Sequence, residues 1–167
     1  MNIFILDESI NESVKCYVNS HITKIPLEMS QMLSTAHRVL SSDETQLNPV
    51  IYKKTHVNHP CSKWIRESKG NYDWAYRMFA ELCSEYSYRY NKTHLCWTKL
   101  KDVLAGPPEL IDSSMKMTPF ALAMPDDCKI PGDAVSSYRK YYSNHKTHLF
   151  AWKNRPQPDW IALHAHL

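Results

Sequence analysis

The sequence has little glycine, with three glycines among 167 residues against ten prolines. Phosphate-binding loops need several backbone positions without a Cβ atom, so this scarcity excludes P-loop and dinucleotide-binding fingerprints. Long apolar runs are also missing, since no window approaches the roughly 18 apolar residues that cross a bilayer. The apolar residues 2–6 lack a preceding basic region and are followed at once by Asp7 and Glu8, unlike a signal peptide. We therefore expect no membrane partner.

The five cysteines are an odd number without regular spacing. This pattern favours reduced thiols and a cytoplasmic location over a disulfide framework. Hydrophobic residues make up 43% of the chain and charged residues 22%, which is typical of a globular protein and excludes wholesale disorder. The length predicts a single domain over residues 1–167.

Positive charge is concentrated near the C-terminus, although the net charge is only +3. Residues 134–158 contain no Asp or Glu but hold five Lys or Arg residues interleaved with aromatic residues. Cations beside flat rings are suited to binding a nucleic acid through its phosphates and bases. An amphipathic helix with aromatic residues in the core explains the same pattern. The candidate binding residues of this basic aromatic segment are Tyr138, Arg139, Tyr142 and Lys146.

Apolar residues recur at helical spacing through most of the chain, which predicts an all-α, compact helical bundle. Residues 2–6 form either a short buried strand or an apolar plug. Five prolines predict a long loop or lid over residues 105–132, and Pro156 and Pro158 predict an exposed tail over residues 153–167 with Trp160 in it. The expected helices cover residues 9–19, 26–40, 62–68, 71–90, 93–104 and 133–152.

The first polar cluster accompanies the second expected helix. An imidazole, an amine and a carboxylate that converge can supply general acid–base catalysis. The simpler explanation is a first-turn glutamate that the helix dipole favours, with solvated neighbours. The cluster consists of His21, Lys24, Glu28, Gln31 and Arg38, of which the catalytic candidates are Glu28, His21 and Lys24.

The second cluster combines imidazoles, amides and an indole that could hydrogen-bond to and stack on a base. A satisfied structural network is the alternative. Nearby Cys61, with His94 and Cys96 further on, raises the question of zinc, but the spacing fits no standard zinc motif and we expect no metal here. The candidate binding residues are Lys53, His56, Asn58, His59, Trp64 and Asn71.

The third cluster lies at the end of the long helix expected over residues 71–90. Glu85 and Arg89 are four residues apart, which is the spacing of an ordinary helical ion pair. Arg89, Lys92 and His94 become binding candidates only if they meet the second cluster in space.

These clusters carry a family resemblance. The blocks Thr55-His-Val-Asn-His-Pro60, Asn71-Tyr-Asp-Trp74 and Glu85-Tyr-Ser-Tyr-Arg-Tyr-Asn-Lys92 resemble a family of small phage-type proteins of uncharacterised role. More remotely, the order of parts is similar to pyrimidine-dimer DNA glycosylases of the endonuclease V type. His21 with Glu28 seven residues later matches the family's first pair, His56 its next element, and residues 138–146 its basic aromatic segment.

The resemblance implies a small, helical, cofactor-free glycosylase and abasic-site lyase that acts on DNA. The family's nucleophile is the α-amine of a small residue exposed when the initiator Met is removed. Here position 2 is Asn, behind which Met1 is usually retained. Either the Met1 amine or Lys24 then forms the Schiff base, or the scaffold serves another task.

The alternative function is a phage-type nucleotide-binding protein that sequesters or modifies a small nucleotide signal without acting on DNA. A third option is a helical interaction module with structural polar clusters. The sequence leaves the lesion, the nucleotide and the oligomeric state open.

Overall fold

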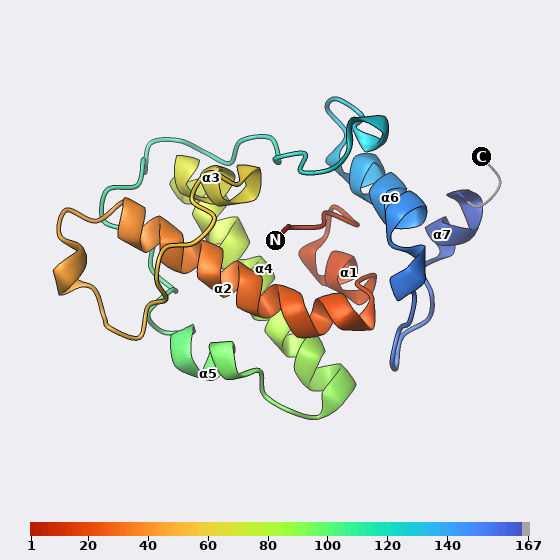
Figure 1. Cartoon of the computed structure of the whole chain (residues 1–167), viewed down its shortest axis with the longest axis horizontal. Coiled ribbons are helices and arrows are strands. Elements are labelled where there is room, and N and C mark those ends of the chain that lie inside the picture. Colours follow the sequence, from red (N-terminus) through yellow and green to blue (C-terminus); the bar gives the residue numbers. More distant parts are fainter. Residues whose placement is uncertain (165–167) are drawn as a thin grey trace.

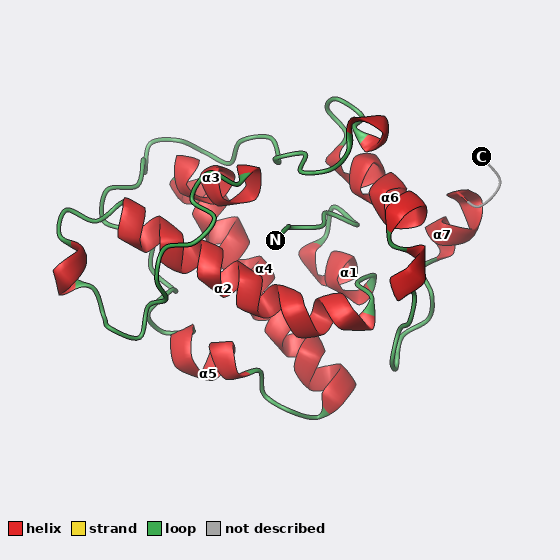
Figure 2. Ribbon diagram, in the orientation of Figure 1, coloured by secondary structure: helices red, strands yellow, loops and turns green. Residues whose placement is uncertain are grey.

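Helices provide the framework of the molecule. The computed structural model describes residues 1–164, which contain seven α-helices, three short 3-10 helices and no strand (Figure 2). The prediction of an all-α fold is confirmed. Among the described helices, none combines the length and the apolarity that a membrane span needs. The elements are α1 (Ile10–Lys15), α2 (Asn19–Val39), η1 (Glu44–Gln46), α3 (Pro60–Glu67), α4 (Lys69–Tyr90), α5 (Leu95–Leu100), η2 (Asp126–Cys128), α6 (Ala134–His145), η3 (Thr147–Leu149) and α7 (Asp159–His164).

The two longest helices, α2 and α4, pack against each other through the middle of the molecule (Figure 1). Helix α3 contacts both of them, α1 packs on α4, and α5 packs on α2. The buried stripe of α2 includes Ile25, Met29 and Leu33, and that of α4 includes Phe79 and Leu82. These residues belong to one continuous apolar core.

The N-terminal segment enters this core as the apolar plug, not as a strand. Residues 3–6 are at most 3% exposed, so their backbone polar groups need partners inside the protein. Side chains provide them: the Tyr17 hydroxyl accepts from the Phe4 N–H at 2.9 Å, and Ser13 Oγ accepts from the Leu6 N–H at 2.9 Å. The segment therefore runs to the centre of the molecule, where Figure 1 marks the N-terminus beside α2.

Helix α2 begins seven residues before the expected start at Pro26. Proline inside a helix loses a hydrogen bond and disfavours the preceding turn by about 3 kcal/mol. Burial of Ile22 and Ile25 in the core offsets this penalty, since both side chains are at most 2% exposed. His21, Lys24 and Glu28 therefore lie on one continuous helix.

Other helix ends differ from the expected ones by several residues. Helix α3 starts at Pro60, with His59 as its N-cap in place of Ser62. Helix α5 is shorter than residues 93–104, and α6 ends at His145, not near residue 152.

The expected exposed tail is wrong around Trp160, which is 9% exposed and lies in α7. Its indole packs near the Tyr142 ring and the Arg139 guanidinium. Residues 165–167 of that prediction lie outside the described residues.

The proline-rich segment, residues 105–132, crosses α3 on its way from α5 to α6 (Figure 1). It is a loop apart from η2, as expected. The Asn71 side chain holds it by accepting from the Thr118 N–H at 2.8 Å, and a Cβ atom on Gly70 would collide with the Met117 backbone. At this point the segment is fixed against α4.

Candidate active site around Glu28

A small polar hollow of about 130 Å³ lies where the N-terminus meets α2 and α6. The buried Asn2 side chain positions the N-terminus there, since its amide donates to the Ala123 carbonyl at 2.7 Å and its oxygen accepts from the Ile3 N–H at 2.8 Å. The hollow is lined by Met1, Asn2, Phe4, His21, Lys24, Ile25, Glu28, Tyr141 and Lys146.

Glu28 lies between two amines. Its Oε2 is 3.5 Å from the α-amine of Met1, and its Oε1 is 3.4 Å from Lys24 Nζ. The Lys24 side chain is 70% exposed, whereas those of Met1 and Glu28 are 4% and 10% exposed. Glu28 is thus buried and the Met1 residue is half-buried, and Lys24 approaches the pair from solvent.

His21 forms the inner wall of the hollow. Burial, together with the positive charges of Lys146, Lys24 and the N-terminal amine, lowers its pKa to about 4. Its Nδ1 is 2.6 Å from the Tyr142 hydroxyl, and its ring stacks on Phe4 with centroids 4.6 Å apart. At neutral pH the imidazole is therefore uncharged and held in one orientation.

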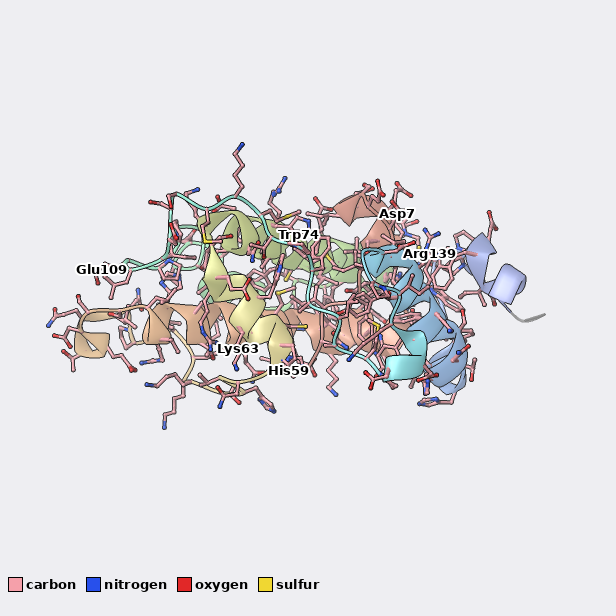
Figure 3. All side chains as sticks on the ribbon, turned by 90° about the horizontal axis from the view of Figure 1, so that it is seen from above. Asp7, His59, Lys63, Trp74, Glu109 and Arg139 are labelled. Atoms are coloured by element: carbon pink, nitrogen blue, oxygen red, sulfur yellow. The ribbon has the colours of Figure 1, made fainter. Side chains whose placement is uncertain are left out.

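Part of the second cluster lies near the hollow. Burial lowers the pKa of His59, and the charges of the Met1 amine and of His56 add to this effect, while Glu28 opposes it. His59 also caps α3 by accepting from the Cys61 N–H at 3.1 Å. In Figure 3, His59 and Lys63 lie on the lower side of the molecule, and Asp7 lies on the upper side.

The other members of the second cluster divide into two groups. Lys53, His56 and Asn58 are exposed in the loop before α3. Trp64 and Asn71 are buried and bind the proline-rich segment instead, because the Trp64 indole donates to the Thr118 carbonyl at 3.3 Å and the Asn71 amide to Thr118 Oγ1 at 2.8 Å. The expectation that these two line the pocket is therefore corrected.

Arg89 is also placed in the interior, where it is 1% exposed. Its guanidinium donates to Glu85 at 2.8 Å and to the Tyr17 carbonyl at 2.7 Å. Burial raises the pKa of Glu85, but hydrogen bonds from Arg155 and Arg89 outweigh it and hold the pKa below its ordinary value. Glu85 and Arg89 thus form a structural ion-pair network that ties α4 to the residues before α2. Arg89 does not contact the second cluster.

Replacing Arg89 by Met is expected to destabilise the protein by about 3–5 kcal/mol, because it leaves Glu85 as a buried charge with one partner fewer. Urea unfolding monitored by circular dichroism measures this change. Lys92→Met, at an exposed position three residues further on, is the matched control and should change stability by less than about 0.5 kcal/mol. Equal stability of the two variants would contradict a structural role for Arg89.

His94 has local partners as well. It caps α5, its Nδ1 is 2.9 Å from Cys96 Sγ, and its Nε2 is 3.1 Å from the Thr23 carbonyl. Hydrogen bonds from Cys83 and from His94 lower the pKa of Cys96 against the effect of burial. Neither His94 nor the exposed Lys92 lines the hollow.

Only part of the basic aromatic segment reaches the hollow. Tyr138 and Tyr142 are fully buried, so they offer no stacking surface. Arg139 donates to the Leu6 carbonyl at 2.8 Å, and its guanidinium is 3.2 Å from the Asp7 carboxylate. Lys146 does line the hollow. The other three candidates of this segment, Tyr138, Arg139 and Tyr142, were expected to bind substrate but do not line the hollow.

Arg38, from the first cluster, is likewise held elsewhere by the carbonyls of Ile51 and Tyr52. Sequence reasoning missed Tyr141, whose ring lies under Lys146 Nζ at 4.9 Å and which lines the hollow. The signal was present, because Tyr138 and Tyr142 share one helical face four residues apart. If that face packs into the core, Tyr141 lies at the edge of the face, next to solvent.

Residues 1–98 match a family model described as pyrimidine dimer DNA glycosylase. The comparisons with curated proteins and with solved structures find no match. The matched residues include the N-terminus and all of α2, and therefore the Met1 amine, His21, Lys24 and Glu28.

Proposed function

This chain belongs to the pyrimidine dimer DNA glycosylase family, and we propose that it excises the damaged base from duplex DNA and then cleaves the strand as a lyase. The observation that carries the proposal is the pair of the Met1 amine and the buried Glu28 carboxylate, 3.5 Å apart in a hollow that opens to solvent. A primary amine is the nucleophile that a Schiff-base reaction requires, and a carboxylate beside it can stabilise the cation that develops.

The Met1 amine is favoured over Lys24 as the nucleophile. Both amines lie within 3.5 Å of Glu28, but Lys24 is on a flexible and mostly exposed side chain. The Asn2 hydrogen bonds fix the N-terminal backbone, so the α-amine is held in one place before substrate arrives. Preorganisation of this kind lowers the entropic part of the barrier. We assign Lys24 to electrostatic support of the phosphate backbone.

The proposed reaction begins when the unprotonated amine attacks C1′ of the damaged nucleotide. The new C–N bond forms as the glycosidic bond breaks, and the base takes that electron pair and a proton while it stays joined to its neighbour through the cyclobutane ring. Opening of the sugar ring then gives an iminium ion at C1′. Loss of a C2′ proton expels the 3′ phosphate, and water hydrolyses the remaining imine to restore the amine.

Glu28 is the group placed to serve these steps. Its carboxylate stabilises positive charge on C1′ and on the iminium nitrogen, and it can carry protons from the amine and from C2′. Neutral His21 and Tyr142 support the wall of the hollow without adding a second positive charge.

The alternative of a free-nucleotide binder is less well supported by the size of the hollow. Pockets that enclose a small ligand usually have about 300 Å³ or more. The hollow at Glu28 has about 130 Å³, which suits one sugar presented by a larger molecule. We keep free-nucleotide binding as an outcome of the test.

The test is incubation with duplex DNA that contains one cyclobutane pyrimidine dimer, in the presence and absence of borohydride. We expect strand cleavage at the dimer without borohydride and a covalent protein–DNA adduct with it. Undamaged duplex of the same sequence is the control. Absence of both cleavage and adduct, together with thermal stabilisation by a free nucleotide, would contradict the proposal.

Lys146 is expected to contact a phosphate at the edge of the hollow. Lys146→Gln should weaken binding to all duplexes and lower the slope of log binding constant against log salt concentration by about 1. Fluorescence anisotropy at several salt concentrations measures the slope. The matched control is Lys101→Gln, at an exposed position that does not line the hollow. An unchanged slope for Lys146→Gln, or the same loss for Lys101→Gln, would refute this assignment.

A further inference from the structure

A second group of metal-ligating side chains lies outside the active site, where η2 packs against α6. It consists of Asp127 and Cys128 in η2 and His145 at the end of α6. Their ligand atoms, a carboxylate oxygen, Sγ and a ring nitrogen, all lie within 4.8 Å of one another. We propose that these three residues bind one zinc-class divalent cation, which fixes the end of the proline-rich segment to α6.

Two of the three separations between the ligand atoms agree with tetrahedral coordination. Bonds of about 2.0–2.3 Å to oxygen, nitrogen and sulfur at tetrahedral angles separate the ligand atoms by about 3.3–3.5 Å. Asp127 Oδ2 is 3.4 Å from His145 Nε2 and 3.7 Å from Cys128 Sγ. Both distances are close to the edges of such a tetrahedron, and the distance between oxygen and nitrogen is long for a hydrogen bond. The third separation, between Cys128 Sγ and the His145 ring nitrogen, is at most 4.8 Å, so binding of a cation closes this pair by up to about 1.3 Å.

The donor set selects the class of metal. A thiolate with an imidazole favours zinc or cobalt, whereas magnesium and calcium prefer oxygen ligands alone. Cys128 is fully buried, while the Asp127 and His145 side chains are 60% and 40% exposed. The fourth position therefore faces solvent and would hold water. Binding would release the proton of the Cys128 thiol.

The Asp127 carboxylate is available for this role. The neighbouring Asp126 pairs with Lys129, with Oδ1 and Nζ 2.7 Å apart. Among the ion pairs of the described residues, Asp127 has no lysine or arginine partner and faces His145 alone. A cation would supply the compensating charge.

The position of the site gives it a structural role. Lys146, which lines the active-site hollow, directly follows His145, and Tyr141 lies one turn earlier on α6. Figure 1 shows η2 alongside α6, at the end of the segment that crosses the molecule without α-helix. Metal binding would join these two parts and hold the α6 wall of the hollow in place.

The test is titration of the reduced, chelator-treated full chain with Co²⁺, followed by displacement with Zn²⁺. We expect one equivalent of Co²⁺ to bind, with a near-ultraviolet absorption band from thiolate ligation. Zn²⁺ at a hundredfold excess over its Kd should raise the Tm by roughly 5 °C or more. His145→Gln and Cys128→Ser should each weaken binding at least tenfold and remove this shift in Tm.

Two control variants separate this site from other thiols and imidazoles. His148→Gln changes an exposed histidine three residues from His145 and should bind Co²⁺ as the original chain does. Cys96→Ser removes the thiol that contacts His94 and should also retain binding. If Cys128→Ser fails to fold, His145→Gln decides the question, since His145 is at the surface. Absence of binding, binding that survives His145→Gln, or binding lost only in Cys96→Ser would overturn the proposal.

Discussion

Glu28→Gln is expected to lower the rate of base excision by about a hundredfold or more. The amide has nearly the same shape as the carboxylate, but it carries no negative charge for the cation at C1′ and cannot accept the protons that the reaction releases. General acid–base and electrostatic effects of single groups each contribute about 10²–10³ in rate. Single-turnover cleavage of a dimer-containing duplex, with enzyme in excess, measures the loss.

The same variant should bind the damaged duplex with an affinity within a few fold of that of the original protein. Glu28 is 8% exposed and lies in the wall of the hollow, so it offers little surface to the phosphates. Glu8→Gln, at an exposed position outside the hollow, is the matched control and should cleave at the original rate. Equal rates for both variants would remove Glu28 from the chemistry.

The second large effect is expected from blocking the N-terminus. Placing a Gly-Ser dipeptide before Met1 turns its amine into an amide, which cannot form a Schiff base, and forces two extra residues into a hollow of about 130 Å³. We expect cleavage and borohydride trapping to fall by about a hundredfold or more, because the new α-amine, on the added glycine, lies two residues away from the position beside Glu28. Gel electrophoresis of the trapped adduct measures the effect.

Two comparisons make this result specific. The same dipeptide at the C-terminus should have no effect on trapping. Lys24→Gln should still form the adduct, at a rate reduced by less than about tenfold, because Lys24 supplies charge and not the reacting amine. An N-terminally extended protein that traps DNA normally would rule out the α-amine.

The helical fold was predictable because its apolar stripes are regular. The stripe through Ile25, Met29 and Leu33 predicts α2 correctly in its second half, and the stripe of α4 predicts a long helix within two residues of its observed ends. Pro26 misled the prediction of the start of α2. The rule that proline disfavours a helix interior takes no account of burial. Here Ile22 and Ile25, three residues apart on one face of α2, are both buried in the core.

The candidate site was predictable only where it lies on one helix. His21, Lys24 and Glu28 share a face of α2, so spacing along the sequence brings them together. The approach of the Met1 amine depends instead on contacts across the chain, such as the bond from Asn2 to the Ala123 carbonyl, which no local pattern reveals.

Charge patterns alone did not separate binding residues from buried ones. Arg89 and Arg139 resemble DNA-binding arginines in the sequence, yet both donate to backbone carbonyls inside the fold. A guanidinium with several hydrogen-bond partners can be buried when each donor is satisfied. The sequence does not show whether such partners exist, because they come from distant segments.

The central claim, that the α-amine beside Glu28 is the nucleophile, is tested most directly by locating the bond between protein and DNA. The adduct trapped with borohydride on a dimer-containing duplex is digested and analysed by tandem mass spectrometry, with the intact mass of the free protein establishing which residue is first. The account predicts one modified nitrogen, the α-amine of Met1, in the N-terminal peptide. Modification of Lys24 Nζ, or of any other lysine with an unmodified N-terminus, would contradict it.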